Sequence, residues 1–339
     1  MKVYIIGGAG LLGSQAAKEL IERGHTVKAI SLPPAPPGAE FPKGLEMEYG
    51  DYTKMTDGEL KERLTGCEGL VFAAGIDERV EAPAPIYDLF MRHNVEPLKR
   101  LFRVAKECGI KHTVVCGSYF SHFCKIRPKE NFTKWHPYMK CRMEQEELCM
   151  SVAGPDFDVA VLELPYIFGT MKGRKPVWVF VVEMFRKLKP ATYFCKGGTA
   201  MVTVRQVGQA LAGALERNRG GNCYPIGWFN ITWKEMLRMF HKYMGVPKKK
   251  ILILPTWIFK FGLIGMRHKQ KKHGVEGGVH MVKFSKLQCS KQYIDKSLGC
   301  EQLGVTDDDI DAAIGQSVSL SCEILDKKLK VVEMQITPE

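Results

Sequence analysis

Three glycines near the start of the chain have the spacing needed to hold a dinucleotide. Gly7, Gly10 and Gly13 form the pattern G-x-x-G-x-x-G between a short β-rich run, residues 2–6, and a helical pattern. Such a turn lets backbone N–H groups and a helix N-terminus approach a pyrophosphate with no Cβ atoms in the way. Its place directly after the first predicted strand indicates dinucleotide binding.

The end of the second predicted strand usually selects the cofactor, through an acid for the ribose of NAD or an arginine for the extra phosphate of NADP. Here the strand ends at Ser31, which is followed by Leu32, Pro33 and Pro34, so neither group is present. The sequence therefore leaves NAD or NADP open. Asp51, after the third predicted strand, is placed to reach the adenine end; its alternative role is to cap a turn.

These residues need a doubly wound sheet to position them, and the alternation of patterns predicts one. We expect a Rossmann domain over 1–168, with 199–224 packing back on it, and a smaller substrate-binding lobe over 169–339. The predicted strands are residues 2–6, 26–31, 45–49, 69–73, 112–116 and 158–164. Helices are expected up to Gly24, from a capping box of Thr56 and Glu59, and over about 86–108 and 138–152.

Composition narrows the class of protein. The 339 residues are 45% hydrophobic and 25% charged, which is typical of globular domains and excludes disorder and collagen. Eleven cysteines without C-x-x-C spacing predict reduced thiols inside a cell, and no metal site is expected. The N-terminal apolar run is too short for a signal peptide, and the longest one, residues 251–266, is short of a membrane span. We therefore expect a cytoplasmic protein.

Beyond the glycines and Asp51, the pair Asn94-Val95, Ser118 followed by Tyr138, and the turn over 164–169 add further landmarks. With them the chain resembles the extended short-chain dehydrogenase/reductase family, the NAD(P)-dependent epimerase/dehydratase group, over most of its length. The resemblance implies that Ser118 and Tyr138 are catalytic. The expected cofactor-binding residues are Gly7, Gly10, Leu11, Leu12, Gly13, Ser31, Asp51, Tyr52, Ala73, Ala74, Gly75, Asn94, Pro165, Tyr166 and Ile167.

The chain departs from the family at the partner of Tyr138. Hydride transfer needs an acid or base on the substrate oxygen, and a phenol with a pKa of about 10 needs a nearby cation to act as a base near neutrality. In the family this cation is a lysine one helical turn later, whereas here Arg142 occupies that position and Lys140 lies on another face. A guanidinium lowers the pKa of the phenol but cannot relay a proton.

Positive charge is concentrated in one part of the chain. Residues 236–275 contain ten Lys or Arg and no Asp or Glu, so this segment accounts for ten of the twelve positive charges in the net charge of +12. Because no reading motif accompanies them, we do not expect nucleic-acid binding. The apolar, basic segment 248–272 has two interpretations: a lid over an apolar substrate pocket, or contact with an anionic membrane surface. The resemblance favours the lid.

The combined prediction is an NAD(P)-dependent oxidoreductase that interconverts a hydroxyl and a carbonyl on a mainly apolar small molecule. Tyr138 would be the acid and base, Ser118 would orient the substrate oxygen, and Arg142 would tune Tyr138. Two alternatives stay open: a nucleotide-sugar epimerase or dehydratase that keeps NAD tightly bound, and a non-catalytic dinucleotide-binding sensor or scaffold. The resemblance also allows a homodimer.

Overall fold

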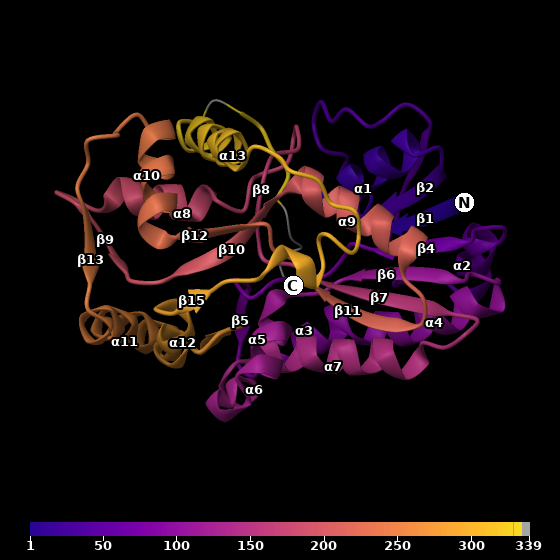
Figure 1. Ribbon diagram of the computed structural model, residues 1–339, viewed down its shortest axis with the longest axis horizontal. Helices are drawn as coiled ribbons and strands as arrows, with labels where there is room; N and C mark the ends of the chain where they lie inside the picture. The colour runs from indigo at the N-terminus through magenta and orange to yellow at the C-terminus, as the bar shows by residue number, and fades with distance from the viewer. Residues whose placement is uncertain (328, 334–339) are drawn as a thin grey trace.

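A seven-stranded sheet forms the larger part of the protein, whose computed structural model describes residues 1–327 and 329–333 (Figure 1). The strand order is β11-β7-β6-β4-β1-β2-β3, and every neighbouring pair is parallel. The predicted doubly wound α/β fold is therefore confirmed. The strands are β1 (Lys2–Ile6), β2 (Thr26–Ser31), β3 (Leu45–Tyr49), β4 (Gly69–Phe72), β6 (His112–Cys116), β7 (Asp158–Glu163) and β11 (Gly221–Pro225).

The strand order reverses between β1 and β4, and this fixes where a ligand binds. From β1 the chain continues to β2 and β3 in one direction, and from β4 to β6, β7 and β11 in the other. Ile6 at the end of β1 pairs with both Ile30 and Phe72, so three strands end at one edge. In open α/β sheets the ligand crevice lies beyond the carboxyl ends of the strands at such a switch point.

Helices cover both faces of this sheet (Figure 1). On one face α1 (Leu11–Glu22) packs against α9 (Val204–Arg217), which belongs to the second half of the chain. The other face carries α2 (Asp57–Leu64), α3 (Tyr87–Asn94), α4 (Glu96–Glu107) and α7 (Pro137–Val152). Each face has its own apolar core, because the sheet is buried on both sides.

The helix expected over about 86–108 is wrong as a single element, since α3 and α4 are separated at Val95. Val95 has φ −118° and ψ −54°, outside ordinary helical values. Pro97, at the start of α4, has no N–H to continue the ladder of helical hydrogen bonds. Two predicted strands also end one residue early, at Phe72 and Glu163.

The sequence predicts no helix or strand between Ser118 and Tyr138, but the structure has three short helices there. They are α5 (Tyr119–Ile126), η1 (Pro128–Glu130) and α6 (Phe132–Trp135).

A smaller lobe stands beside the carboxyl edge of the sheet (Figure 1). Its centre is β10 (Gly198–Thr203), which pairs with β8 (Tyr166–Phe168), β12 (Phe229–Thr232) and β15 (Lys291–Gln292). Two-stranded pairs join β9 (Thr192–Cys195) to β13 (Ile251–Leu254), and β5 (Glu81–Pro83) to β14 (Val275–Gly277). The remaining helices are α8 (Val179–Lys187), α10 (Trp233–Tyr243), α11 (Thr256–Lys272), α12 (Met281–Gln288), η2 (Lys296–Leu298) and α13 (Ile310–Leu325).

The eleven cysteines, all within the described residues, form no disulfide. Across residues 1–327 and 329–333, no three His, Cys, Asp or Glu side chains are grouped so that they could hold a metal ion. Within the same residues, none of the helices combines the length and the apolar character needed to cross a bilayer.

An ion cluster of one half-exposed lysine and two buried carboxyl groups ties α5 and α7 to β7. Lys125 of α5 places its Nζ 2.9 Å from Oε2 of Glu146 on α7 and 2.8 Å from Oε1 of Glu163 on β7. The Glu163 side chain is 0% exposed, and burial together with the charge of Glu146 raises its pKa to about 8. Lys125 therefore neutralises two carboxyl groups that would otherwise repel each other.

Removing this cation should destabilise the fold in a pH-dependent way. We expect Lys125→Met to lower the free energy of unfolding by about 2 kcal/mol near pH 8, less than for a fully buried pair because Lys125 still reaches water. The loss should shrink towards pH 6, because Glu163, with its pKa raised above that of an unfolded glutamate, then binds a proton in the folded state. Urea unfolding at both pH values measures it.

Lys129→Met, at a nearby exposed lysine, is the matched control and should change stability little at either pH. Equal losses for Lys125→Met at the two pH values would contradict the role assigned to the carboxyl pair.

Candidate active site

The glycine turn lies at the switch point and is closely packed. Gly7 has φ +93°, and a Cβ there would lie 2.7 Å from the carbonyl oxygen of Ala73. A Cβ on Gly13, in the first turn of α1, would lie 2.2 Å from the carbonyl oxygen of Gly7. Contacts that short with backbone atoms exclude any side chain, so both positions require glycine.

The N-terminus of α1 is open to an anion. Its N-cap is Gly10, which has no side chain to satisfy the first N–H groups, and no acidic residue lies in the first turn. These free N–H groups and the positive end of the helix dipole suit a pyrophosphate, so the turn fits a dinucleotide. Leu11 and Leu12 follow in the same turn, and Arg174 brings a cation beside it by donating from Nε to the Ala9 carbonyl at 2.9 Å.

The residues expected at the adenine end lie along the same edge. Ser31 is buried at the end of β2, where its carbonyl accepts from the N–H of Gly50. The Asp51 carboxylate accepts from the N–H of Thr53 at 3.0 Å and from its hydroxyl at 2.6 Å, which is the arrangement of a turn cap. The ring of Tyr52 packs edge-on against Phe72, with centroids 6.2 Å apart.

Asn94 is used by the backbone of the loop after β4. Its side chain is fully buried, accepts from the N–H of Ile76 at 2.9 Å and donates to the Ile76 carbonyl at 3.0 Å. Ala73 and Ala74 lead into this loop, and a Cβ on Gly75 would lie 2.4 Å from the Asn94 Oδ1. In the structure Asn94 therefore holds residues 73–76 in place, with its amide already occupied.

The turn after β7 forms the aromatic wall between sheet and lobe. Pro165 directly follows Leu164, and Tyr166 and Ile167 then form most of β8. The ring of Tyr166 packs against Trp178 and Trp233, with centroids 5.4 Å and 5.5 Å apart. This places the expected nicotinamide end of the crevice against aromatic side chains.

Ser118, Tyr138 and Arg142 are brought together at the end of β6. Ser118 is the N-cap of α5, and Tyr138 lies in the first turn of α7. The Tyr138 ring packs edge-on against Phe90 at 5.4 Å and Phe120 at 6.2 Å. One turn later, the guanidinium carbon of Arg142 lies 5.0 Å from the centre of the Tyr138 ring.

Opposing influences set the acidity of Tyr138. Burial raises its pKa above the ordinary value of 10, and the negative charge of Glu78 raises it further. The charge of Arg142, and hydrogen bonding with Arg142 and Ser118, act in the opposite direction by stabilising the phenolate. Because the upward influences are larger, the phenol is protonated near neutral pH.

Arg142 is held by neutral oxygens. Its guanidinium donates to the Cys116 carbonyl at 3.2 Å, to Oε1 of Gln145 at 2.7 Å and to the Ile76 carbonyl at 3.4 Å. Gln145 in turn donates to the Asn94 carbonyl at 2.6 Å. This network fixes the cation under Tyr138 with its charge directed at the phenol.

Sequence reasoning missed Glu78, Arg79, Gln145 and Arg174. Glu78 acts electrostatically on Tyr138 and Tyr166 from the loop after β4, and its own pKa is raised by burial. Arg79 pairs with Asp77, and burial lowers the pKa of Arg79 to about 10. The position of Glu78 and Arg79 in the sequence could have indicated them, because charged residues directly after a central strand lie at the edge of the sheet where ligands bind.

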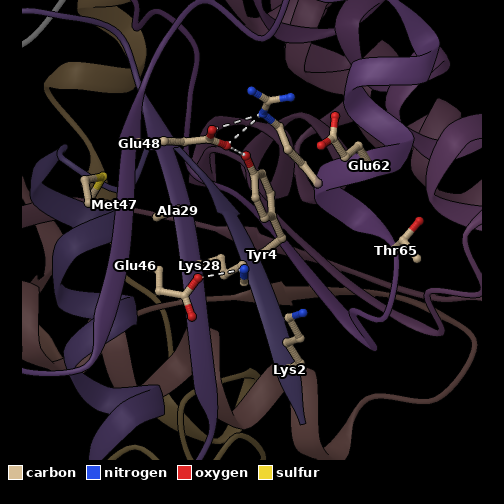
Figure 2. A pocket seen from close by; sticks show the side chains of 10 residues that line it. Lys2, Tyr4, Lys28, Ala29, Glu46, Met47, Glu48, Glu62 and Thr65 are labelled. Carbon is tan, nitrogen blue, oxygen red and sulfur yellow. Dashed lines mark hydrogen bonds and ion pairs between the residues drawn. The ribbon is translucent and has the colours of Figure 1, made fainter.

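A polar cavity of about 440 Å³ lies elsewhere, over β1, β2 and β3 (Figure 2). Two ion pairs lie in it: Nε of Arg63 is 2.9 Å from Oε1 of Glu48, and Nζ of Lys28 is 2.6 Å from Oε2 of Glu46. The hydroxyl of Tyr4 also donates to Glu48. None of the expected site residues lines this cavity, so it is separate from the dinucleotide crevice.

A glycine turn at the switch point of a doubly wound sheet defines the class, an α/β protein that binds a dinucleotide. Comparison with protein families matches residues 3–227 to the "NAD dependent epimerase/dehydratase family", and the chain belongs to that family. It is accordingly an NAD-dependent enzyme of the extended short-chain dehydrogenase type, as the resemblance implied.

Individual relatives are distant but cover most of the chain. A "Putative dihydroflavonol 4-reductase" from Synechocystis is 23% identical over 332 residues, 93% of each chain. A "4-hydroxy-2-methyl-3-oxo-4-farnesyl-3,4-dihydroquinoline-1-oxide ketoreductase" from Stigmatella aurantiaca is 23% identical over 236 residues, 66% of this chain and 67% of that one. The UDP-glucuronic acid 4-epimerase of Bacillus cereus, solved with NAD, has the same fold with a TM-score of 0.66, 12% identity, and coverage of 96% of this chain and 99% of that one.

The glycine turn gives a direct test of the cofactor site. We expect Gly13→Ala to weaken the binding of NADH and NADPH at least about tenfold, because the new methyl group would meet the Gly7 carbonyl and displace the turn. Fluorescence titration measures both cofactors. Gly58→Ala, in α2 and with no close backbone neighbour, is the control; unchanged affinity in Gly13→Ala would place the cofactor elsewhere.

Proposed function

We propose that the protein is an NAD(P)-dependent oxidoreductase that interconverts a hydroxyl and a carbonyl on a mainly apolar small molecule. The observation that carries this proposal is the buried group of Ser118, Tyr138 and Arg142 beside the glycine turn. A phenol, a hydroxyl and a fixed cation next to a dinucleotide crevice form an acid–base group for a substrate oxygen.

The side chains act on the substrate oxygen while the hydride moves at its carbon. A bound nicotinamide dinucleotide supplies or accepts that hydride. In reduction the Tyr138 phenol donates its proton to the carbonyl oxygen, and in oxidation the Tyr138 phenolate removes the proton from the hydroxyl. The Ser118 hydroxyl holds the same oxygen against the phenol.

Arg142 stabilises the charged form of Tyr138 during this exchange. Its positive charge is permanent, so it favours the phenolate without giving up a proton. The proton that restores Tyr138 must therefore come from another donor.

The surroundings favour an apolar substrate. Aromatic rings, among them Phe90, Phe120 and Tyr166, surround the phenol. The names of the two reductase relatives refer to a dihydroflavonol and a farnesylated dihydroquinoline oxide, both built on aromatic rings. We propose a hydrophobic carbonyl or alcohol of similar character for this enzyme, with its polar groups directed at Glu78 and Arg79.

A nucleotide-sugar epimerase is the second candidate, favoured by the fold shared with the Bacillus cereus enzyme and by the charged Glu78 and Arg79. An epimerase returns the hydride to the same substrate, so purified protein would hold NAD and consume none. A reductase instead changes the 340 nm absorbance of the cofactor with its substrate. If the protein binds the cofactor but shows neither activity, the result would support the remaining interpretation, a non-catalytic sensor or scaffold.

Replacing the phenol tests the chemistry. We expect Tyr138→Phe to lower kcat at least about 100-fold, because proton transfer to the substrate oxygen is lost. Titration with NADH should give the same affinity as in the unmodified protein. The control is Tyr224→Phe in β11, which removes a hydroxyl that donates to Asn218. Full activity in Tyr138→Phe would overturn the assignment.

The charges around Tyr138 predict opposite shifts in the pH profile. Glu78→Gln removes a negative charge and should lower the pKa of Tyr138, so kcat/KM for alcohol oxidation should rise at a pH about one unit lower. Arg142→Met removes the positive charge and should move the same rise to higher pH. Arg142→Lys keeps a positive charge and should return the pH profile to that of the unmodified protein. Glu62→Gln, at the cavity of Figure 2, should leave the profile unchanged. Shifts in the same direction for Glu78→Gln and Arg142→Met would contradict this account.

A further inference from the structure

The end of the lobe farthest from the seven-stranded sheet is formed by β13 and α11 (Figure 1). The two follow each other in the chain, with Pro255 between them. Their sequence is the apolar segment flanked by cations, and neither element plays a part in the site described above.

One face of α11 packs against the protein and the opposite face is exposed. Leu263 is 8% exposed and lies with Phe259 and Gln270 on the inner face, where α11 contacts α12 and β14. Trp257 and Phe261 are 64% and 66% exposed. Trp257 and Phe261 therefore lie on the exposed face of α11 and not in a packed core.

Large exposed apolar side chains lie both on α11 and on the strand before it. Trp257 and Phe261 pack against each other edge-on with centroids 6.3 Å apart, and Ile264 follows on the same helical face. Leu252 and Ile253 are exposed on the preceding strand. A contiguous group of large exposed apolar side chains marks an interaction surface, whereas scattered single ones do not. We name these five residues the apolar rim.

Cations surround the apolar rim without counterions. Residues 248–275 hold eight Lys or Arg and no Asp or Glu. Within the part of the chain that the structure describes, none of these eight forms an ion pair, although many other exposed lysines and arginines do. The eight cations are Lys248, Lys249, Lys250, Lys260, Arg267, Lys269, Lys271 and Lys272.

A surface hollow of about 820 Å³ lies at the start of β9 and β13. Its walls combine apolar groups, such as Met244 and Val246, with the cations Lys189 and Lys248 and with Arg186, which is paired with Asp326. A hollow with both characters suits a negatively charged head group attached to an apolar chain. It lies directly before the apolar rim in the sequence, so the two belong to one end of the lobe.

We propose that this end of the lobe docks on an anionic phospholipid surface. The apolar rim would enter the boundary between head groups and acyl chains. The exposed cations of the segment would face the negatively charged head groups, and they are Lys248, Lys250, Lys260, Lys269, Lys271 and Lys272. The helix would lie in the plane of the surface, in keeping with the absence of a membrane-crossing helix from the described residues.

A second copy of the chain is a poorer occupant. In a two-fold pair the same patch meets itself, so eight cations would face eight cations with no acid in the patch to offset them. A lipid surface carries the opposite charge and accepts apolar side chains at any position. Charge complementarity thus selects the lipid.

The docking end is also linked to the site through hydrogen bonds. The side chain of Gln270 on α11 donates to Glu81 of β5 at 2.7 Å, and the carbonyl of Gly278, which follows β14, accepts from the N–H of Tyr138 at 3.0 Å. The docking segment is therefore connected to the backbone that holds Tyr138. The proposal itself is independent of the reaction and is tested without substrate.

The test is co-sedimentation of the full chain with vesicles. One set is phosphatidylcholine alone, and the other contains about 30 mol% phosphatidylglycerol. We expect binding to the anionic vesicles, little binding to the neutral ones, and at least about tenfold weaker binding at about 0.5 M salt, where charges are screened. No binding to anionic vesicles would overturn the proposal.

Two variants separate the contributions of the apolar rim and the cations. Trp257→Ser with Phe261→Ser, and Lys269→Glu with Lys271→Glu and Lys272→Glu, should each weaken binding at least about tenfold. Because all five side chains are exposed, the fold should survive, as circular dichroism can verify.

Matched controls change equally exposed residues elsewhere and should bind like the unmodified protein. They are Ile126→Ser with Leu298→Ser for the apolar rim, and Lys43→Glu with Lys99→Glu and Lys111→Glu for the charge. If the charge control weakened vesicle binding equally, the net charge of the protein would explain the effect, and a defined docking surface would be contradicted. A dimer in light scattering that Trp257→Ser with Phe261→Ser dissociates, without vesicle binding, would assign the surface to a second copy.

Discussion

A permanently charged guanidinium buried without a carboxylate partner is the constraint on which the site depends. Arg142 must be satisfied by neutral oxygens, and these come from the end of β6, from the loop after β4 and from Gln145 on its own helix. A charge buried at this depth needs partners for its donors, and here Nη1 and Nη2 donate to these oxygens whereas Nε has no partner. Satisfying it therefore fixes α7 against the ends of two strands, and Tyr138 is fixed with it.

The same constraint explains the character of Tyr138. Burial keeps the phenol neutral, Arg142 reduces the free energy of ionising it, and Glu78 increases that free energy. A residue that must both give and take a proton benefits from Arg142, because its charge offsets part of the free energy needed to ionise the buried phenol. The acid–base group is thus a property of three elements together, and the helix carrying Tyr138 would not supply it alone.

Local patterns predicted the parts of the molecule that depend on local physics. The glycine spacing, the Thr56 capping box and most strand limits are set by neighbouring residues, and the structure confirms them. The roles of Asn94 and Glu78 could not be read in the same way. The Asn94 amide is occupied by Ile76, and Glu78 reaches Tyr138 only after the sheet has assembled. Such contacts join residues far apart in sequence, for which spacing carries no information.

The return of α9 and β11 to the large sheet limits how this architecture can be divided. The chain leaves the sheet after β7, builds part of the lobe, and comes back to supply an edge strand and the helix that covers α1. Cutting at the first exit would strip that edge and uncover the apolar face that Val207 and Leu211 of α9 cover. The lobe therefore cannot be replaced as a separate domain. A new substrate specificity on this fold has to arise by changes in loops within one folding unit.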